Sequence, residues 1–271
     1  MPLLQRPRHS IAYETLGDPA KPPVLLIMGL ALSSRAWVTL PALLSSDHYV
    51  ITLDNRGTGR SARHGVAYKM RDLAADALAV LDVLGVRAAH VFGISMGGMI
   101  AQELALRAPE RVRSLVLGCT FASWRRARGP GFRTALDLLL LNLGLAKPER
   151  LARLLLSAEW DEANPGKALE WMRASERTKL RFATAQLLAI VRHHTVPRLA
   201  GLKAPTLILT GDRDRLVPPV NSQVLHAAIP GSRLHVLKGA GHAFPLEREE
   251  ETLRVLREHF SAAEGRARAS A

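Results

Sequence analysis

The sequence predicts an α/β fold in which a mostly parallel central sheet has flanking helices and an inserted helical cap. Three observations predict it. Short apolar runs recur along the chain, helical patterns alternate with them, and one long helical stretch interrupts the alternation. Parallel strands are buried on both faces, so they read as nearly continuous apolar runs. Strands that alternate with helices imply crossover connections and a parallel sheet.

The expected strands are seven apolar segments rich in β-forming residues. They are Ile11–Leu16, Val24–Met28, Tyr49–Leu53, His90–Ile94, Ser114–Leu117, Thr206–Thr210 and Arg233–Leu237. Between them, Arg71–Leu84 and Met96–Arg107 have helical patterns. The second helix should end at Ala108-Pro109, because the residue before a proline avoids helical backbone angles.

The alternation breaks once, between about residues 121 and 197, where the patterns are helical and no strand is convincing. We therefore expect residues 1–120 and 198–265 to form the α/β core and 121–197 to form the cap. The cap should cover the carboxyl edge of the sheet, where α/β proteins bind ligands. Residues 266–271 should be a disordered tail, with fraying beginning near Ser261.

The chain has 271 residues and one cysteine, Cys119, which cannot form an internal disulfide. This fits a reducing compartment. Residues 1–10 lack the apolar segment of a secretion signal, and the leucine-rich stretch Leu136–Ala146 is too short to span a bilayer. We expect a soluble, cytoplasmic protein with no membrane association, whose oligomeric state the sequence leaves open.

The net charge is +13, from 37 Lys and Arg against 24 Asp and Glu. Such a charge attracts nucleic acid or anionic membranes. However, 30 of the 37 are Arg, they are scattered, and the densest cluster, Arg125-Arg126-Ala127-Arg128, is short. Nucleic-acid-binding proteins usually gather basic residues and interleave aromatic ones. We therefore expect a small-molecule substrate and no nucleic-acid partner.

The strongest functional signal is Gly93-Ile94-Ser95-Met96-Gly97-Gly98, between the expected strand and the helix that begins at Met96. In this context G-x-S-x-G predicts a nucleophile elbow, in which the serine has a strained backbone and the glycines let strand and helix approach closely. The hydroxyl then projects above the sheet, beside a helix N-terminus that favours negative charge. Ser95 is the predicted nucleophile.

A serine hydroxyl needs a base to take its proton. Among ten histidines, His242 follows the glycine-rich Gly239-Ala240-Gly241 and lies between the last expected strand and the final helix. This places it at the same sheet edge as Ser95, as the predicted general base. The base needs an acid to fix its tautomer. Asp212 and Asp214, after the strand Thr206–Thr210, are both candidates.

The sequence resembles the α/β-hydrolase fold family of the esterase, enol-lactonase and perhydrolase type over nearly its whole length. The chain order of serine, aspartate and histidine is that of this family. The matching motifs are Met28-Gly29-Leu30, Asp54-Asn55-Arg56-Gly57-Thr58-Gly59-Arg60-Ser61, the elbow, Gly211-x-x-Asp214-x-x-x-Pro218 and Gly241-His242.

The resemblance implies that Asp214, not Asp212, is the acid of the triad. It also implies an oxyanion hole built from the backbone amides of Leu30 and of Met96, the residue after the nucleophile. The sequence departs from the commoner pattern at Met28, a position often held by histidine. Methionine cannot donate the hydrogen bonds of a histidine, so the support of this loop must differ.

Trp37 and His193 are candidates for the substrate pocket, although Trp37 lies near a predicted helix start and His193 near a helix end, where structural roles are common. The Asp54–Ser61 loop is rich in glycine but lacks the spacing of a phosphate-binding loop. No cluster of histidine, cysteine or acidic residues has metal-ligand spacing in the sequence. We expect no metal and no organic cofactor.

The predicted function is hydrolysis of carboxylic esters or lactones of small to medium hydrophobic substrates through an acyl-enzyme. Carbon–carbon bond hydrolysis of a diketone, a perhydrolase activity and a non-catalytic ligand-binding role are the alternatives. Ser95 argues against haloalkane dehalogenase and epoxide hydrolase activities, because the relatives with those activities have aspartate at this position.

Overall fold

The computed structural model describes residues 2–7, 9–61, 68–131, 133–134, 150, 154–175 and 178–269. Eight strands within these residues form one sheet. They are β1 (Leu3–Arg6), β2 (His9–Leu16), β3 (Pro23–Ile27), β4 (Tyr49–Leu53), β5 (Ala89–Ile94), β6 (Val112–Gly118), β7 (Thr206–Gly211) and β8 (Arg233–Leu237). Their order is β1-β2-β4-β3-β5-β6-β7-β8. The pairs β1/β2 and β2/β4 are antiparallel and the other five are parallel.

The predicted fold class is confirmed, and the seven expected segments lie in strands, except that Met28 follows the end of β3. The eighth strand, β1, was not predicted. It has four residues, pairs only with β2 at the edge of the sheet, and alternates between exposed and half-buried side chains. A strand of this kind has no continuous apolar run to reveal it.

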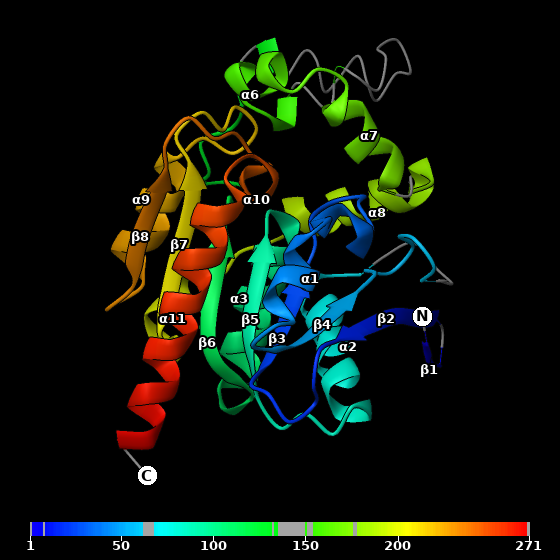
Figure 1. Cartoon of the computed structure of the whole chain (residues 1–271), viewed down its shortest axis with the longest axis vertical. Coiled ribbons are helices and arrows are strands. Elements are labelled where there is room, and N and C mark those ends of the chain that lie inside the picture. Colours follow the sequence, from blue (N-terminus) through cyan, green and yellow to red (C-terminus); the bar gives the residue numbers. More distant parts are fainter. Residues whose placement is uncertain are drawn as a thin grey trace.

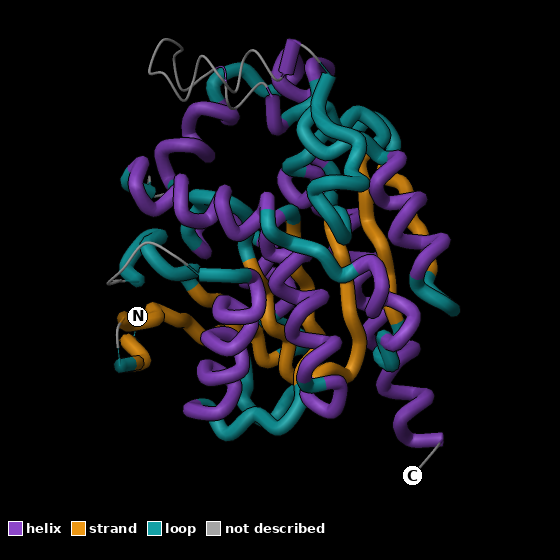
Figure 2. Tube along the Cα trace, turned by 180° about the vertical axis from the view of Figure 1, so that it is seen from behind, coloured by secondary structure: helices purple, strands orange, loops and turns teal. Residues whose placement is uncertain are grey.

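Helices cover both faces of the sheet (Figure 1, and from behind Figure 2). One face carries α1 (Leu40–Leu44) and α11 (Glu249–Ala269), and the other carries α2 (Met70–Val83), α3 (Met96–Arg107) and α9 (Val220–Ala228). The shorter elements are η1 (Ser34–Trp37), η2 (Pro109–Arg111), η3 (Val196–Gly201) and α10 (Phe244–Glu247). Each face of the sheet therefore has its own apolar core, and the strands contribute alternate side chains to the two.

Three helices lie between β6 and β7 in the chain: α6 (Ala158–Ala163), α7 (Lys167–Ala174) and α8 (Leu180–Val191). In Figure 1, α6 and α7 lie beyond the carboxyl ends of the parallel strands. The indole Nε1 of Trp171 on α7 donates to the carbonyl of Ala36 at 3.0 Å, which anchors this insertion to the core. The boundaries of core and cap stay predictions, and the stretch Leu136–Ala146 lies outside the described residues.

The C-terminal helix is longer than expected. Fraying was expected from about Ser261 and a disordered tail from residue 266, but helix α11 continues to Ala269. Residues 270 and 271 lie outside the described residues. Alanine, arginine and glutamate are strong helix formers, so the same composition that lacks an apolar pattern still favours a helix. Among the described residues, no helix combines the length and the hydrophobicity that a membrane crossing needs.

Three histidines, His48, His90 and His259, are buried around Phe260 of α11. The ring of His90 stacks on that of Phe260 with centroids 4.6 Å apart, and its Nδ1 lies 2.8 Å from the hydroxyl of Ser114. Burial lowers the pKa of His90 to about 3 and that of His259 to about 4, and it also lowers the pKa of His48. These side chains are therefore neutral in the folded protein at neutral pH.

The buried histidines predict a loss of stability in mild acid. Below about pH 6.5 the unfolded chain binds protons that the folded chain cannot, so the free energy of unfolding should fall as pH decreases. Each such histidine contributes up to about 1.4 kcal/mol per pH unit. Denaturant unfolding between about pH 7 and about pH 4.5 measures this slope. His90→Phe should make it shallower, whereas the exposed control His226→Asn should not; equal slopes in all three proteins would contradict the prediction.

Candidate active site

Ser95 lies between β5 and α3 with φ 57° and ψ −121°, a region that residues other than glycine rarely adopt. Its backbone is held on both sides: its amide donates to the carbonyl of Gly118 at 2.8 Å, and its carbonyl accepts from the hydroxyl of Thr120 at 2.8 Å. A Cβ on Gly93 would lie 2.2 Å from the carbonyl oxygen of Gly97. The strained, closely packed elbow that the sequence predicts is therefore present in the structure.

The predicted oxyanion loop passes next to the serine. A Cβ on Gly29 would lie 3.2 Å from the Cβ of Ser95 and 3.6 Å from its Oγ. Leu30 follows Gly29, and Met96 is the first residue of α3, where helical amides have no partner within the helix. Within the described part of the chain, the amides of Leu30 and Met96 donate to no protein acceptor. Both are thus free to bind an oxyanion beside Ser95.

His242 and Asp214 form a buried pair. The Nδ1 of His242 lies 2.7 Å from Oδ2 of Asp214, and Oδ1 of Asp214 accepts from the amides of Leu216 and Val217, both at 2.8 Å. Asp214 is 4% exposed and His242 is 6% exposed. With three donors on its oxygens, the carboxylate favours the tautomer of His242 that has its proton on Nδ1, which leaves Nε2 to accept a proton.

Asp212 has a different contact. Its carboxylate accepts from the amide of Gly239 at 2.7 Å, in the loop that precedes His242. The geometry therefore distinguishes the two candidates that the residues alone left open, because only Asp214 contacts the histidine.

Ser95, Asp214 and His242 follow β5, β7 and β8, and so lie at the same edge of the sheet. Within the described residues, no hydrogen bond joins the Ser95 hydroxyl to His242. Catalytic hydrogen bonds are often long before substrate binds. The participation of Ser95 in a triad with the pair stays a prediction.

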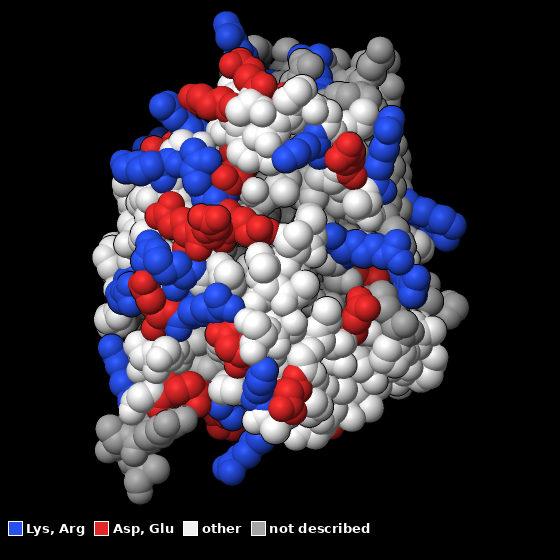
Figure 3. Space-filling view, viewed as in Figure 1, with Lys and Arg blue, Asp and Glu red and all other residues white. Residues whose placement is uncertain are grey.

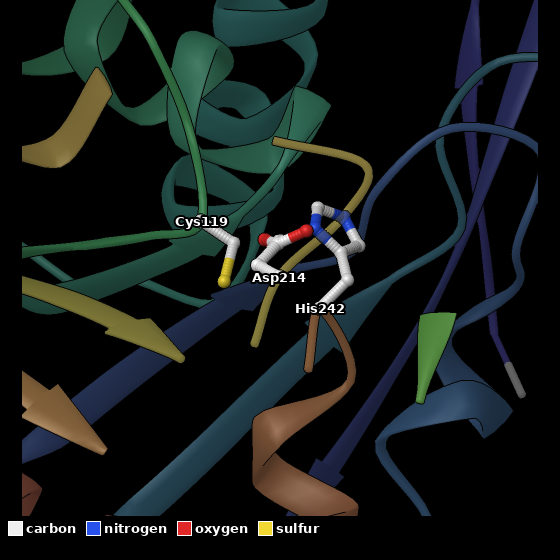
Figure 4. A group of neighbouring side chains, drawn as sticks. All are labelled: Cys119, Asp214 and His242. Carbon is white, nitrogen blue, oxygen red and sulfur yellow. Dashed lines mark hydrogen bonds and ion pairs between the residues drawn. The ribbon is translucent and has the colours of Figure 1, made fainter. Parts of the chain in front are cut away.

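Cys119 is a third neighbour of the buried pair, on the side of Asp214 away from His242 (Figure 4). One potential ligand atom from each of the three residues lies within 4.8 Å of the others. Burial, and then the carboxylate of Asp214, raise the pKa of the thiol well above its usual value. A metal ion would need the cysteine as thiolate, whereas its raised pKa keeps the thiol protonated. Asp214 already accepts three hydrogen bonds, so these three side chains do not suit a metal ion as ligands.

The two pocket candidates are both buried. Trp37 is 3% exposed and its ring lies 5.0 Å from that of Phe92, between centroids, in the core under α1 and α11. His193 is 3% exposed, and burial lowers its pKa to about 4. Its Nε2 lies 3.4 Å from the hydroxyl of Thr195. These surroundings favour packing roles, and a contact of either residue with substrate stays a prediction.

Glu247, which sequence reasoning missed, connects the histidine loop to the cap. Its carboxylate accepts from the amide of Gly241 at 2.8 Å and from the amide of Ser157 at 2.9 Å, and burial raises its pKa. A Cβ on Gly241 would lie 2.8 Å from the backbone of Leu156. The loop that carries His242 is therefore packed directly against the segment before α6, and glycine is required at the closest point.

Comparison with known proteins adds to this geometry. The alpha/beta hydrolase fold family model matches residues 22–249. The chain belongs to the α/β-hydrolase fold family. It is 34% identical to the rhodomycin D methylesterase DauP of Streptomyces sp. (strain C5) over 92% of this chain and 94% of that protein.

Two solved structures show the same fold. The enol-lactonase of Burkholderia xenovorans LB400 superposes with a TM-score of 0.85 at 24% identity, covering 96% of this chain and all of the other. A thermophilic esterase from Thermogutta terrifontis superposes with a TM-score of 0.78 at 26% identity and 94% coverage of both chains. Together with the methylesterase, the thermophilic esterase identifies this hydrolase as an enzyme that acts on ester bonds.

Proposed function

We propose that this enzyme is a serine esterase that cleaves carboxylic esters or lactones of small to medium hydrophobic substrates through an acyl-enzyme on Ser95. The observation that carries the proposal is the buried pair of His242 and Asp214 at the sheet edge where the strained elbow presents Ser95. A pair that fixes the tautomer of a histidine is what a weakly nucleophilic hydroxyl needs nearby.

In the proposed reaction, Oγ of Ser95 attacks the carbonyl carbon of the ester while Nε2 of His242 takes the hydroxyl proton. The negative charge on the carbonyl oxygen is stabilised by the amides of Leu30 and Met96. The intermediate collapses to an acyl-enzyme, and His242 returns the proton to the departing alcohol. Water, deprotonated by His242, then releases the acid and restores Ser95. With a lactone, alcohol and acid remain in one product.

The cap supports the preference for hydrophobic substrates. Leu155, Leu156, Trp171 and Met172 pack in the same apolar cluster as Met28 of the oxyanion loop. Not all of the apolar cap residues do so. Trp124 is 45% exposed, whereas Phe132 and Leu138–Leu141 lie outside the described residues.

We also propose that surface arginines pair with neighbouring carboxylates and do not form a nucleic-acid-binding site. On the face in Figure 3, Lys and Arg side chains are interspersed with Asp and Glu. Arg257 pairs with Asp47 at 2.9 Å, and Arg113 pairs with Glu264 at 2.8 Å. Such exposed pairs contribute little stability each, but they reduce the net field that a polyanion would meet.

A panel of substrates tests the proposed specificity. With p-nitrophenyl acetate, butyrate and octanoate, we expect kcat/KM to rise by up to about fourfold for each methylene that the apolar cap buries. A monoester of a dicarboxylic acid should react more slowly than the neutral ester of equal length. A kcat/KM that does not change with chain length would contradict a cap that lines the substrate site with apolar side chains. A preference for the anionic ester would indicate recognition by arginines of the cap.

A methyl ester of a larger carboxylic acid is the second candidate substrate, because the relative DauP is a methylesterase that matches over nearly the full length of both chains. Methyl esters of a small and of a large carboxylic acid, compared at equal concentration, distinguish the two. Faster release of methanol from the larger ester would favour this second candidate over small to medium substrates.

A further inference from the structure

The side chain of Gln186 connects the cap to the oxyanion loop. It projects from α8 and is fully buried. Its Oε1 accepts from the amide of Ala31 at 2.8 Å, and its Nε2 donates to the hydroxyl of Thr58 at 2.8 Å and to the carbonyl of Arg56 at 3.3 Å. One amide group therefore joins two core loops that are separate in sequence, and its acceptor and both its donors are used.

Ala31 is held by the cap on both of its backbone groups. Its amide donates to Gln186, and its carbonyl accepts from the hydroxyl of Thr178 at 3.0 Å. Its φ is 60°, the left-handed region, where alanine is strained and needs its surroundings to hold it. The amide of Ala31 belongs to the peptide that follows Leu30. Holding Ala31 therefore restrains Leu30 from its carboxyl side, and with it the Gly29–Leu30 peptide that carries the proposed oxyanion donor.

The second loop that Gln186 contacts also holds the oxyanion loop. The side-chain Nδ2 of Asn55 donates to the carbonyl of Met28 at 2.9 Å, and the carboxylate of Asp54 accepts from the backbone amide of Ser34 at 2.7 Å. Residues 54–58 thus fix the two ends of the segment from Met28 to Ser34. Gln186 and Thr178 fix its middle, and in the described structure no core side chain hydrogen-bonds to Ala31.

We propose that Gln186 is a positioning residue, which orients the Leu30 amide through Ala31 so that the cap completes the oxyanion hole. The proposal rests on the proposed function of Ser95 and Leu30. The hydrogen bonds that hold this loop come from Asn55, Asp54 and Gln186 of the cap. Together they replace the support that the commoner histidine at the position of Met28 would give. The cap therefore does more than cover the substrate, since the transition state depends on it.

Two variants of Gln186 test this. Gln186→Met has a similar length but removes all three hydrogen bonds. Gln186→Glu, neutral in this buried site, keeps a carbonyl acceptor for Ala31 and a hydroxyl donor for Thr58. We expect Gln186→Met to lower kcat for p-nitrophenyl butyrate by about 10- to 100-fold with KM changed by less than about threefold, because misplacing a donor affects the transition state most. Gln186→Glu should recover most of kcat.

If Gln186→Met does not fold, Thr178→Val tests whether the cap's hold on Ala31 affects kcat. It removes only the hydroxyl that binds the carbonyl of Ala31, and it should lower kcat by about three- to tenfold. The exposed Gln223→Met on α9 is the matched control and should behave as wild type. A kcat within about twofold of wild type in Gln186→Met, or in Thr178→Val where the first variant is unfolded, would overturn the proposal. So would a change confined to KM, or no recovery in Gln186→Glu.

Wild type and Ser95→Ala are assayed beside these variants. If Ser95→Ala keeps its turnover, the proposed function itself fails. If Ser95→Ala is inactive while Gln186→Met turns over normally, the serine mechanism stands and the role of Gln186 fails.

Discussion

Ser95→Ala is expected to abolish ester hydrolysis and leave the fold intact. The hydroxyl is the attacking atom, and its loss costs about 10⁶-fold in kcat in serine proteases that use the same chemistry. The backbone bonds to Gly118 and Thr120 remain in the variant, because they do not involve the side chain. Alanine is as strained as serine at a φ of 57°, so the midpoint of thermal unfolding should change by less than about 3 °C.

The measurement is the initial rate with p-nitrophenyl butyrate, with protein purified free of contaminating esterases. Ser222→Ala, at a buried serine of α9 distant from the elbow in the chain, is the control and should keep its activity. Turnover near that of wild type in a folded Ser95→Ala variant would contradict the mechanism.

Asp214→Asn is expected to lower kcat by about 10⁴-fold, as the equivalent change does in a serine protease. The Asn amide would donate to Nδ1 of His242, which then holds its own proton on Nε2 and cannot accept one from Ser95. The remaining Asn oxygen still accepts from the amides of Leu216 and Val217, so the loop should keep its conformation.

Asp212→Asn is the matched control. It retains an oxygen that accepts from the amide of Gly239, and in the described structure no hydrogen bond joins Asp212 to His242. We expect a loss of about tenfold or less, by an indirect effect on the histidine loop. If Asp212→Asn loses more activity than Asp214→Asn, the acid of the pair has been assigned to the wrong residue.

The sequence predicts the parts of the fold that depend on local pattern. The buried strands are continuous apolar runs, and the elbow has glycines at Gly93 and Gly97 because strand and helix approach too closely there for a side chain. The paired Asp214 and His242 were identified from motifs at strand ends, where residues distant in sequence share one edge of a parallel sheet.

The parts that were missed depend on contacts between distant segments. Gln186 is a polar residue within the apolar pattern of α8, and Glu247 lies in a short charged segment, so neither has a spacing that reveals its partner. Trp37 and His193 were pocket candidates by their positions in the chain, but both are almost fully buried, and burial is set by how the cap and sheet pack. The one signal in the sequence for Gln186 was a polar residue among the apolar residues of a helical pattern.

The central claim is that Ser95 forms a covalent intermediate, and stoichiometric labelling tests it most directly. The purified enzyme is incubated with a fluorophosphonate, and its intact mass and tryptic peptides are measured. We expect one adduct per chain, located on Ser95, and loss of ester turnover in proportion to the fraction labelled. Labelling should be absent in Ser95→Ala and strongly slowed in Asp214→Asn, which lacks a productive base. Full ester turnover by a fully labelled protein, or an inactivating adduct on a residue other than Ser95, would contradict the account.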